Sequence, residues 1–350
     1  MNQVIAKPKV RESNFELLRI IAMFMVLVLH ADFVALGVPT TSDIISSPMA
    51  STFKVFFEVT SIVAVNVFIL IAGWFGIRPS IRGFCKFIFQ CLFFSIGAYM
   101  IMILCGRVDF SYRGLANCFA LIPNNTYWFI PSYLCLYFFS PVLNTFIRHA
   151  DKSTFTMVLV AFYIFQTIYS FLGHGALFLM RGYSGLSFIG LYLLAAYIKV
   201  NIDKIKLSSF ELLAGYLAVT ICLVLAWMGS RYLNFNFINT RLLYYSNPLV
   251  ILSSLFLFLL FSKVYLSSCI INKVAASSFA VYLLHCNPNV YEFYLTSIGN
   301  SHVYSGLLQA IYICGLICVW FLVAVILDVF RIVLWDFLQN LIGCKDCNNL

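Results

Sequence analysis

An arginine and a histidine stand inside the first long apolar segment of the chain. Arg19 and His30 lie within residues 15–36, a segment long enough to span a bilayer as a helix. Ionisable groups at that depth cost free energy, so their presence favours a functional role. Their separation of 11 residues is close to three helical turns. The two side chains are therefore predicted to share one helix face, about 16.5 Å apart along the axis. Glu16, three residues before Arg19, falls on that face too.

The composition predicts that lipid surrounds this segment and most of the chain. Hydrophobic residues make up 62% of the sequence and charged residues only 10%, which excludes an ordinary soluble domain. Because a bilayer core offers no water to unpaired backbone groups, long uniformly apolar segments must be helices, whereas barrel strands would alternate polar and apolar residues. The predicted fold class is all-α, a polytopic transmembrane bundle of about ten helices. The predicted spans are residues 15–36, 53–77, 84–105, 127–147, 154–172, 186–200, 207–228, 248–266, 275–298 and 304–334.

The positive residues predict that both termini are cytoplasmic. With the N-terminus inside, the inner segments carry 15 of the 22 Lys and Arg residues, the outer segments carry six, and Arg19 is the remaining one. Residues 1–14 are then a cytoplasmic segment, residues 15–337 one membrane domain, and residues 338–350 a cytoplasmic tail. The net charge of +9 reflects this topology. No interleaved basic and aromatic surface indicates a nucleic acid partner.

The cysteines do not predict a metal centre. Most of the 12 cysteines are isolated in apolar segments, where free Cys behaves as a small hydrophobic residue. Cys344 and Cys347 form a terminal C-x-x-C, but one such pair supplies only half of a structural zinc site. We therefore expect no bound metal or cofactor.

Charged residues of the first helices indicate two ends of a possible site. Glu58, in the second span, comes to nearly the depth of His30, where it either helps to form an oriented base or extends outward to the interface. Arg19 lies at the cytoplasmic level together with Arg78 and Arg82. A guanidinium cluster suits phosphate oxygens, so an anionic, phosphate-bearing ligand is predicted to enter from the cytoplasm. Lys86, at a similar level, is interpreted as ordinary topology-determining charge.

Four stretches of the chain, taken in order, carry a further signal. They are ELLRIIAMFMVLVLH (residues 16–30), VFILIAGWF (67–75), YWFIPSYLCLYFFSPVLN (127–144) and SFAVYLLH (278–285). Together they resemble the acyltransferase 3 family of integral membrane acyltransferases. The chain departs from the family at two places. Ala72-Gly73 stands where the family commonly has Ser-Gly, and Arg78 and Arg82 have three residues between them instead of the two of an R-x-x-R pattern.

This resemblance implies an enzyme of the bacterial cytoplasmic (inner) membrane. The implied reaction transfers an acyl group, usually acetyl, from acyl-CoA to a hydroxyl of a surface polysaccharide or lipid-linked glycan. His30 is implied as the general base or as a transient acyl carrier, and Arg19, Arg78 and Arg82 as ligands of the acyl-CoA. Because no esterase-like domain follows, transfer is expected to be completed in the membrane domain or with a separate envelope biosynthesis protein. Membrane lipids are the remaining expected partners.

Three further residues have two interpretations each. Tyr282 and His285, three residues apart on the ninth predicted span, either line the acceptor path or only form a packed hydrogen bond. Trp128 either belongs to the interfacial aromatic belt or stacks on a sugar ring. Glu16 is expected to support Arg19.

A transporter or flippase for lipid-linked sugars is the alternative function. Polar residues in several spans favour it, whereas the absence of a detectable internal repeat and the concentration of the polar signal in one helix oppose it. An envelope scaffold without chemistry would leave the pairing of Arg19 with His30 unexplained.

Overall fold

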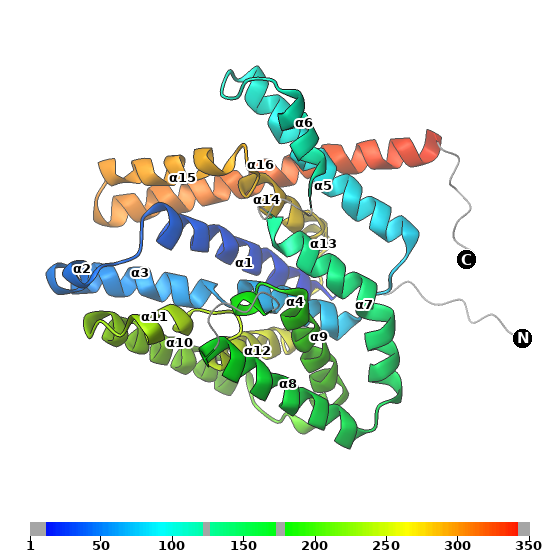
Figure 1. Ribbon diagram of the computed structural model, residues 1–350, viewed down its shortest axis with the longest axis vertical. Helices are drawn as coiled ribbons and strands as arrows, with labels where there is room; N and C mark the ends of the chain where they lie inside the picture. Colours follow the sequence, from blue (N-terminus) through cyan, green and yellow to red (C-terminus); the bar gives the residue numbers. More distant parts are fainter. Residues whose placement is uncertain (1–11, 122–126, 173–178, 342–350) are drawn as a thin grey trace, which may run out of the picture.

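The computed structural model describes residues 12–121, 127–172 and 179–341, which form helices joined by short connections (Figure 1). These ranges contain no strand, so the all-α prediction is confirmed for them. Within these ranges, seven helical stretches are long and apolar enough to cross a membrane, as a multi-pass protein requires. They are Ser13–Ala35, Pro48–Phe75, Ile81–Leu104, Phe129–His149, Lys152–Ser170, Ser209–Tyr232 and Gly306–Leu341.

These long stretches include two that are made of successive helices. The first consists of α1 (Ser13–Leu29) and the π-helix η1 (His30–Ala35), and the second of α3 (Pro48–Ser61) and α4 (Ala64–Phe75). The short α2 (Thr41–Ser46) lies between them. The others are α5 (Ile81–Leu104), α7 (Phe129–His149), α8 (Lys152–Leu172), α10 (Ser209–Tyr232) and α16 (Gly306–Leu341).

The remaining three predicted spans coincide with shorter apolar helices. They contain α9 (Gly185–Val200), α12 (Pro248–Ser262) and the run of α13 (Cys269–Ala276), α14 (Ser278–His285) and α15 (Tyr291–Gly299). The count of about ten spans stays a prediction, because these helices are shorter than a full span. The connecting elements are α6 (Tyr112–Phe119), α11 (Asn236–Leu242), η3 (Met180–Gly182), η4 (Ile202–Lys204) and η5 (Asn300–Val303).

The prediction of one continuous helix over residues 275–298 is wrong. The chain leaves the helix after His285 and resumes at Tyr291, so this segment has a break within the bundle. Pro288 explains the break, because proline lacks a backbone donor and its ring disfavours helical geometry at the preceding residue. Asn287 Oδ1 accepts a hydrogen bond from the backbone N–H of Asn289 at 2.9 Å and so fixes the turn.

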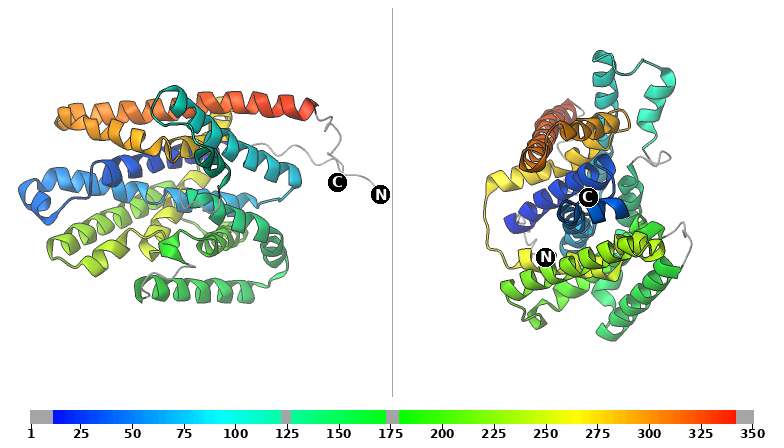
Figure 2. Two further views of the ribbon diagram at one scale, coloured as in Figure 1. Left: turned by 45° about the horizontal axis from the view of Figure 1, so that its top comes forward. Right: turned by 90° about the vertical axis from the view of Figure 1, so that its left-hand side faces the viewer.

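Helix α1 lies in the middle of the bundle. It packs against α3, α4, α12, α13, α14 and α16, and Figures 1 and 2 show helices on all sides of it. Phe15, Leu18, Ala22 and Leu27 are at most 1% exposed, so these positions of the helix are buried in protein rather than in lipid. The polar residues of α1 therefore face other helices, which can supply partners for them.

Side-chain caps fix where several helices begin. Ser80 Oγ accepts from the backbone N–H of Gly83 at the start of α5, and Ser184 does the same for Ser187 at the start of α9. Ser208 and Glu211 form a reciprocal capping box at the start of α10. These caps satisfy backbone donors that the first helical turn leaves without partners.

Helix α1 begins and α16 ends at the same end of the bundle (Figures 1 and 2). The assignment of that end to the cytoplasm stays a prediction. Residues 1–11 and 342–350, including Cys344 and Cys347, lie outside the described residues.

Candidate active site

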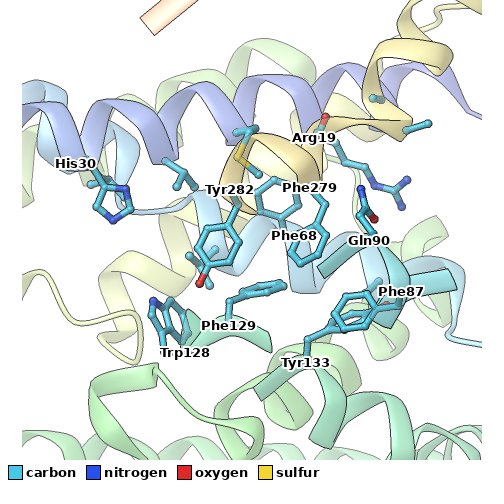
Figure 3. Close-up of a pocket in the computed structure, with 18 of the residues that line it drawn as sticks. Arg19, His30, Phe68, Phe87, Gln90, Trp128, Phe129, Tyr133, Phe279 and Tyr282 are labelled. Atoms are coloured by element: carbon cyan, nitrogen blue, oxygen red, sulfur yellow. The ribbon is translucent and has the colours of Figure 1, made fainter. Parts of the chain in front are cut away.

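An elongated cavity of about 520 Å³ runs beside α1. Side chains of α1, α4, α5, α7, α14 and α16 line it, and most of them are apolar or aromatic. Phe87 of α5 and Phe279 of α14 stack with centroids 5.4 Å apart and close one wall. Figure 3 shows Arg19 and Gln90 at one end of the cavity and His30 with Trp128 at the other. The cavity therefore connects the two residues that the sequence places on one face of α1.

His30 begins the π-helix η1, in which the backbone hydrogen bonds have the wider spacing of that helix type. Such short π-helical stretches often occur at functional sites, because the extra residue redirects side chains. His30 is half-buried and lines the cavity. Its Nδ1 lies 3.0 Å from Nε2 of His285 on α14. The partner of His30 is thus another imidazole from a helix that is distant in sequence.

The hydrogen-bond network defines which nitrogen of each ring carries the proton. His285 Nδ1 lies 2.6 Å from the carbonyl oxygen of Val281, which can only accept, so Nδ1 of His285 is the donor. His285 is 1% exposed, and charging it there would cost desolvation free energy, so its Nε2 is left as an acceptor. His30 Nδ1–H must then donate to His285 Nε2. Nε2 of His30 consequently keeps its lone pair, as a general base requires.

Cys286 lies next to this pair. Its Sγ is 3.3 Å from His285 Nε2 and 3.9 Å from His30 Nδ1, so the three side chains form the one metal-type ligand group in the described ranges. The two ring nitrogens are already within hydrogen-bond distance of each other. The expectation of no bound metal stays a prediction.

Glu58 lies at the His30 end of the cavity and does not extend outward. It lines the cavity and is 7% exposed, so the interpretation of Glu58 as a residue that reaches the interface is wrong. Its Oε2 is buried and has no hydrogen-bond partner among the described residues. The carboxylate is therefore available to a ligand hydroxyl, while the hydrogen bond that orients His30 comes from His285.

Arg19 is paired as the sequence suggested. Its Nη1 donates to both carboxylate oxygens of Glu16, at 2.9 and 3.0 Å. The Arg19 side chain keeps 32% exposure and lines the cavity, whereas the Glu16 side chain is 8% exposed. Glu16 thus holds the guanidinium in place and leaves part of it open to a ligand.

Arg78 and Arg82 are not among the described residues that line the cavity. Both are exposed, and Arg82 donates to Gln339 Oε1 at 2.9 Å. Lys86 and Arg331 line the cavity instead. Sequence reasoning assigned these two cations to topology, because a similar depth in the membrane does not show which side chains face the cavity.

Aromatic side chains surround the His30 end. The ring centroids of Trp128 and Tyr183 are 4.3 Å apart, and Trp128 stacks on Tyr245 at 5.9 Å. Tyr282 also lines the cavity and, with Phe129, lies between Trp128 and the Arg19 end (Figure 3). Sequence reasoning identified Trp128 and Tyr282 but missed Tyr183 and Tyr245, which lie in or beside loops and have no distinctive spacing.

Two of the stretches that carry the family resemblance also brace the walls of the cavity. Tyr127 Oη donates to the carbonyl of Leu283 at 2.8 Å and accepts from Asn287 Nδ2 at 2.9 Å, which fixes α14 against the start of α7. At the opposite end of α7, Asn144 Nδ2 donates to the carbonyl of Ile77 at 2.8 Å. Tyr192 Oη donates to Asn144 Oδ1 at 2.6 Å, so α7, α9 and the end of α4 form one unit.

Comparison with family models gives a match that covers most of the chain. The acyltransferase 3 family model, described as an acyltransferase domain, matches residues 12–329. This range contains every predicted site residue. Comparisons with curated proteins and with solved structures give no match. The family match and the apolar helices agree with the resemblance seen in four stretches of the sequence, and the chain belongs to the acyltransferase 3 family of membrane acyltransferases.

Proposed function

We propose that the protein is an O-acyltransferase that transfers an acyl group, with acetyl as the favoured case, from cytoplasmic acyl-CoA to a hydroxyl of a surface polysaccharide or lipid-linked glycan. The observation that carries this proposal is the contact of His30 Nδ1 with Nε2 of the carbonyl-bound His285, from which the tautomer of His30 is inferred. His30 lines the cavity, and its Nε2 keeps a free lone pair. His285 fixes the orientation of the His30 ring. A general base for a hydroxyl acceptor has this arrangement.

The reaction needs no group beyond the two substrates and this side chain. The acceptor oxygen bonds to the thioester carbonyl carbon while His30 Nε2 takes the hydroxyl proton. The carbon–sulfur bond then breaks, and His30 returns the proton to the departing sulfur of CoA. The products are an ester and free CoA, and His30 is neutral again. If His30 instead carried the acyl group as a transient intermediate, the same Nε2 lone pair would attack the thioester carbonyl carbon.

The donor is proposed to lie along α1. Its phosphates bind at the Arg19 end, and its extended pantetheine arm follows the cavity toward His30, over about 16.5 Å of helix axis. The aromatic and aliphatic walls suit an uncharged arm, and excluding water there protects the thioester from hydrolysis. Arg78 and Arg82 stay predicted donor ligands that lie outside this path.

The acceptor sugar is proposed to bind at the His30 end. Trp128 and Tyr183 offer rings on which a sugar can stack, and Glu58 Oε2 accepts a hydrogen bond from a sugar hydroxyl. Tyr282 lines the acceptor path, and His285 acts through His30. The proposed location is the cytoplasmic membrane of a bacterium, with glycan and envelope biosynthesis proteins as partners.

A transfer assay in detergent tests this function. Purified protein receives radiolabelled acetyl-CoA and glycan from the native host, and label in the glycan is counted. His30→Gln is expected to reduce transfer by roughly 10²- to 10⁴-fold, the usual contribution of a general base. His149→Gln is the matched control, because His149 is exposed, lies outside the cavity and has its Nδ1 beside the carbonyl oxygen of Thr145.

The same assay separates the enzyme from a flippase. No membrane divides two compartments in detergent, so a flippase yields no labelled product. Transfer that requires His30 supports the enzyme. Undiminished transfer by His30→Gln, or no transfer together with His30-dependent movement of an unmodified lipid-linked sugar across sealed proteoliposomes, would overturn it.

A further inference from the structure

A buried ion pair on α16 lies at the Arg19 end of the cavity. Arg331 donates from Nε and Nη2 to the two carboxylate oxygens of Asp328, at 2.9 and 2.8 Å. Gln90 of α5 donates to Asp328 Oδ1 at 2.9 Å. Arg331 is 2% exposed and Asp328 is fully buried. The guanidinium is therefore held rigidly from two helices in a place where few water molecules can reach it.

One nitrogen of the Arg331 guanidinium takes no part in this ion pair. Nη1 of Arg331 is buried and has no hydrogen-bond partner among the described residues. A buried donor without a partner costs free energy, and a charged donor costs more. Arg331 and Gln90 both line the cavity, so a ligand there can supply the missing acceptor.

The charges around this nitrogen favour an anion. Arg19, Lys86 and Arg331 all line the cavity, and Gln90, which holds Asp328, lies at the Arg19 end (Figure 3). Among the described residues, two carboxylates are paired with these cations, those of Glu16 and Asp328. One positive charge therefore remains uncompensated. Three cations from α1, α5 and α16 converge there, and phosphate oxygens suit both guanidinium and ammonium donors.

We propose that Arg331 Nη1 binds a phosphate oxygen of the acyl donor, with Arg19 and Lys86 completing the subsite. This inference rests on the proposed function and identifies its donor by chemistry, as a thioester of phosphorylated pantetheine. Asp328 and Gln90 are positioning residues, because they hold the guanidinium and do not themselves meet the phosphate. The subsite thereby selects donors that carry phosphate over donors that consist of the arm alone.

Binding measurements with three donors test this subsite. Calorimetry on the purified full chain measures the Kd of acetyl-CoA, acetyl phosphopantetheine and acetyl pantetheine. The variant pairs Arg331→Gln with Asp328→Asn, because removing only the cation would leave a buried carboxylate unpaired. We expect the double variant to bind the two phosphate-bearing donors roughly ten- to a hundredfold more weakly, as for the loss of a charged hydrogen bond. Its Kd for acetyl pantetheine should equal that of the wild type.

Two further variants keep the test decisive. Lys273→Gln is the matched control, because Lys273 is an exposed cation of α13 that does not line the cavity, and its Kd values should not change. Arg331→Lys keeps the buried charge pair and serves if the double variant does not fold. This variant should also weaken the binding of the phosphate-bearing donors selectively, since an ammonium group lacks the planar fork of a guanidinium.

The outcomes distinguish this inference from the proposed function. If the binding of acetyl-CoA alone becomes weaker, the result would still support the subsite and would assign it to the phosphates of the nucleotide half. Equal weakening of all three donors, or unchanged binding, would overturn it while leaving a CoA-dependent enzyme in place. If the wild type binds none of the three thioesters, the proposed donor itself is wrong.

Discussion

At the residue scale, the decisive contact joins two histidines that are 255 positions apart in sequence. The base in many hydrolases and transferases is oriented by a carboxylate, and Glu58 was the natural candidate for that role from its depth in the membrane. The structure instead places a neutral, carbonyl-anchored imidazole behind His30. A neutral acceptor fixes the tautomer of His30 without adding a buried negative charge, which is less costly inside a bundle.

His285 is therefore predicted to act as a positioning residue. His285→Leu removes the acceptor for His30 Nδ1–H, and we expect kcat to fall by roughly ten- to a hundredfold, less than when the base itself is removed. His285→Gln places an amide oxygen near the former Nε2 and should restore most of the activity, with KM unchanged in both variants. Steady-state kinetics of label transfer measure these values. Equal activity in the two variants would show that His285 serves packing alone.

At the element scale, the close contact between α4 and α9 forms one wall beside the cavity. A Cβ atom at Gly73 of α4 would collide with the backbone oxygen of Tyr192 on α9, and would lie 2.8 Å from the Cα atom of that residue. Neither backbone atom can move alone. The neighbouring Ala72 lines the cavity, so a shift of α4 would also change the width of the site.

Gly73→Ala is predicted to destabilise the protein by about 1–3 kcal/mol, the usual cost of overpacking. Gly97→Ala in α5 is the matched control, because a Cβ atom there meets nothing within 4 Å and alanine favours the helix. Thermal unfolding in detergent should show a lower Tm for the first variant and an equal or higher Tm for the second. An unchanged Tm for Gly73→Ala would contradict the close approach of the two helices.

At the scale of the whole molecule, the cavity has two chemically different ends. Arg19 lies at one end with Gln90, and His30 lies at the other with Trp128, whereas aromatic rings line the cavity between them (Figure 3). The helix break after His285 and the π-helix at His30 lie at the same depth, because the two histidines are in contact. The molecule is thus organised so that an anionic group and a reacting carbonyl are held at different depths.

Membrane vesicles of known orientation test the side from which the donor enters. Since CoA does not cross a bilayer and the cationic end is predicted to be cytoplasmic, inverted vesicles supplied externally with acetyl-CoA should transfer label. Right-side-out vesicles should transfer little until they are permeabilised. A fluorescent reporter fused after Leu350, which folds only in the cytoplasm, checks the predicted side of the C-terminus. Transfer in intact right-side-out vesicles alone would contradict the predicted topology.

The sequence alone was enough for the helical class and for the polar face of the first helix. Both depend on local properties, because hydrophobic length and helical periodicity act along a contiguous segment. Arg19, Glu16 and His30 lie on one helix, so their spacing already predicted that they face one region. The motif stretches supplied the family for the same reason, as each is a short run of consecutive residues.

Only the tertiary structure decided the partners of these residues. Three side chains reach the site from separate helices, His285 from α14, Arg331 from α16 and Lys86 from α5. Their placement depends on how these helices pack, which no local pattern encodes. Glu58 shows the same limit, because equal depth on two antiparallel helices does not fix rotation about either axis. The break after His285 was locally readable from Pro288, yet uniform hydrophobicity concealed it. The sequence thus predicted the depth of each residue along its own helix, whereas contacts between residues of different helices depend on packing.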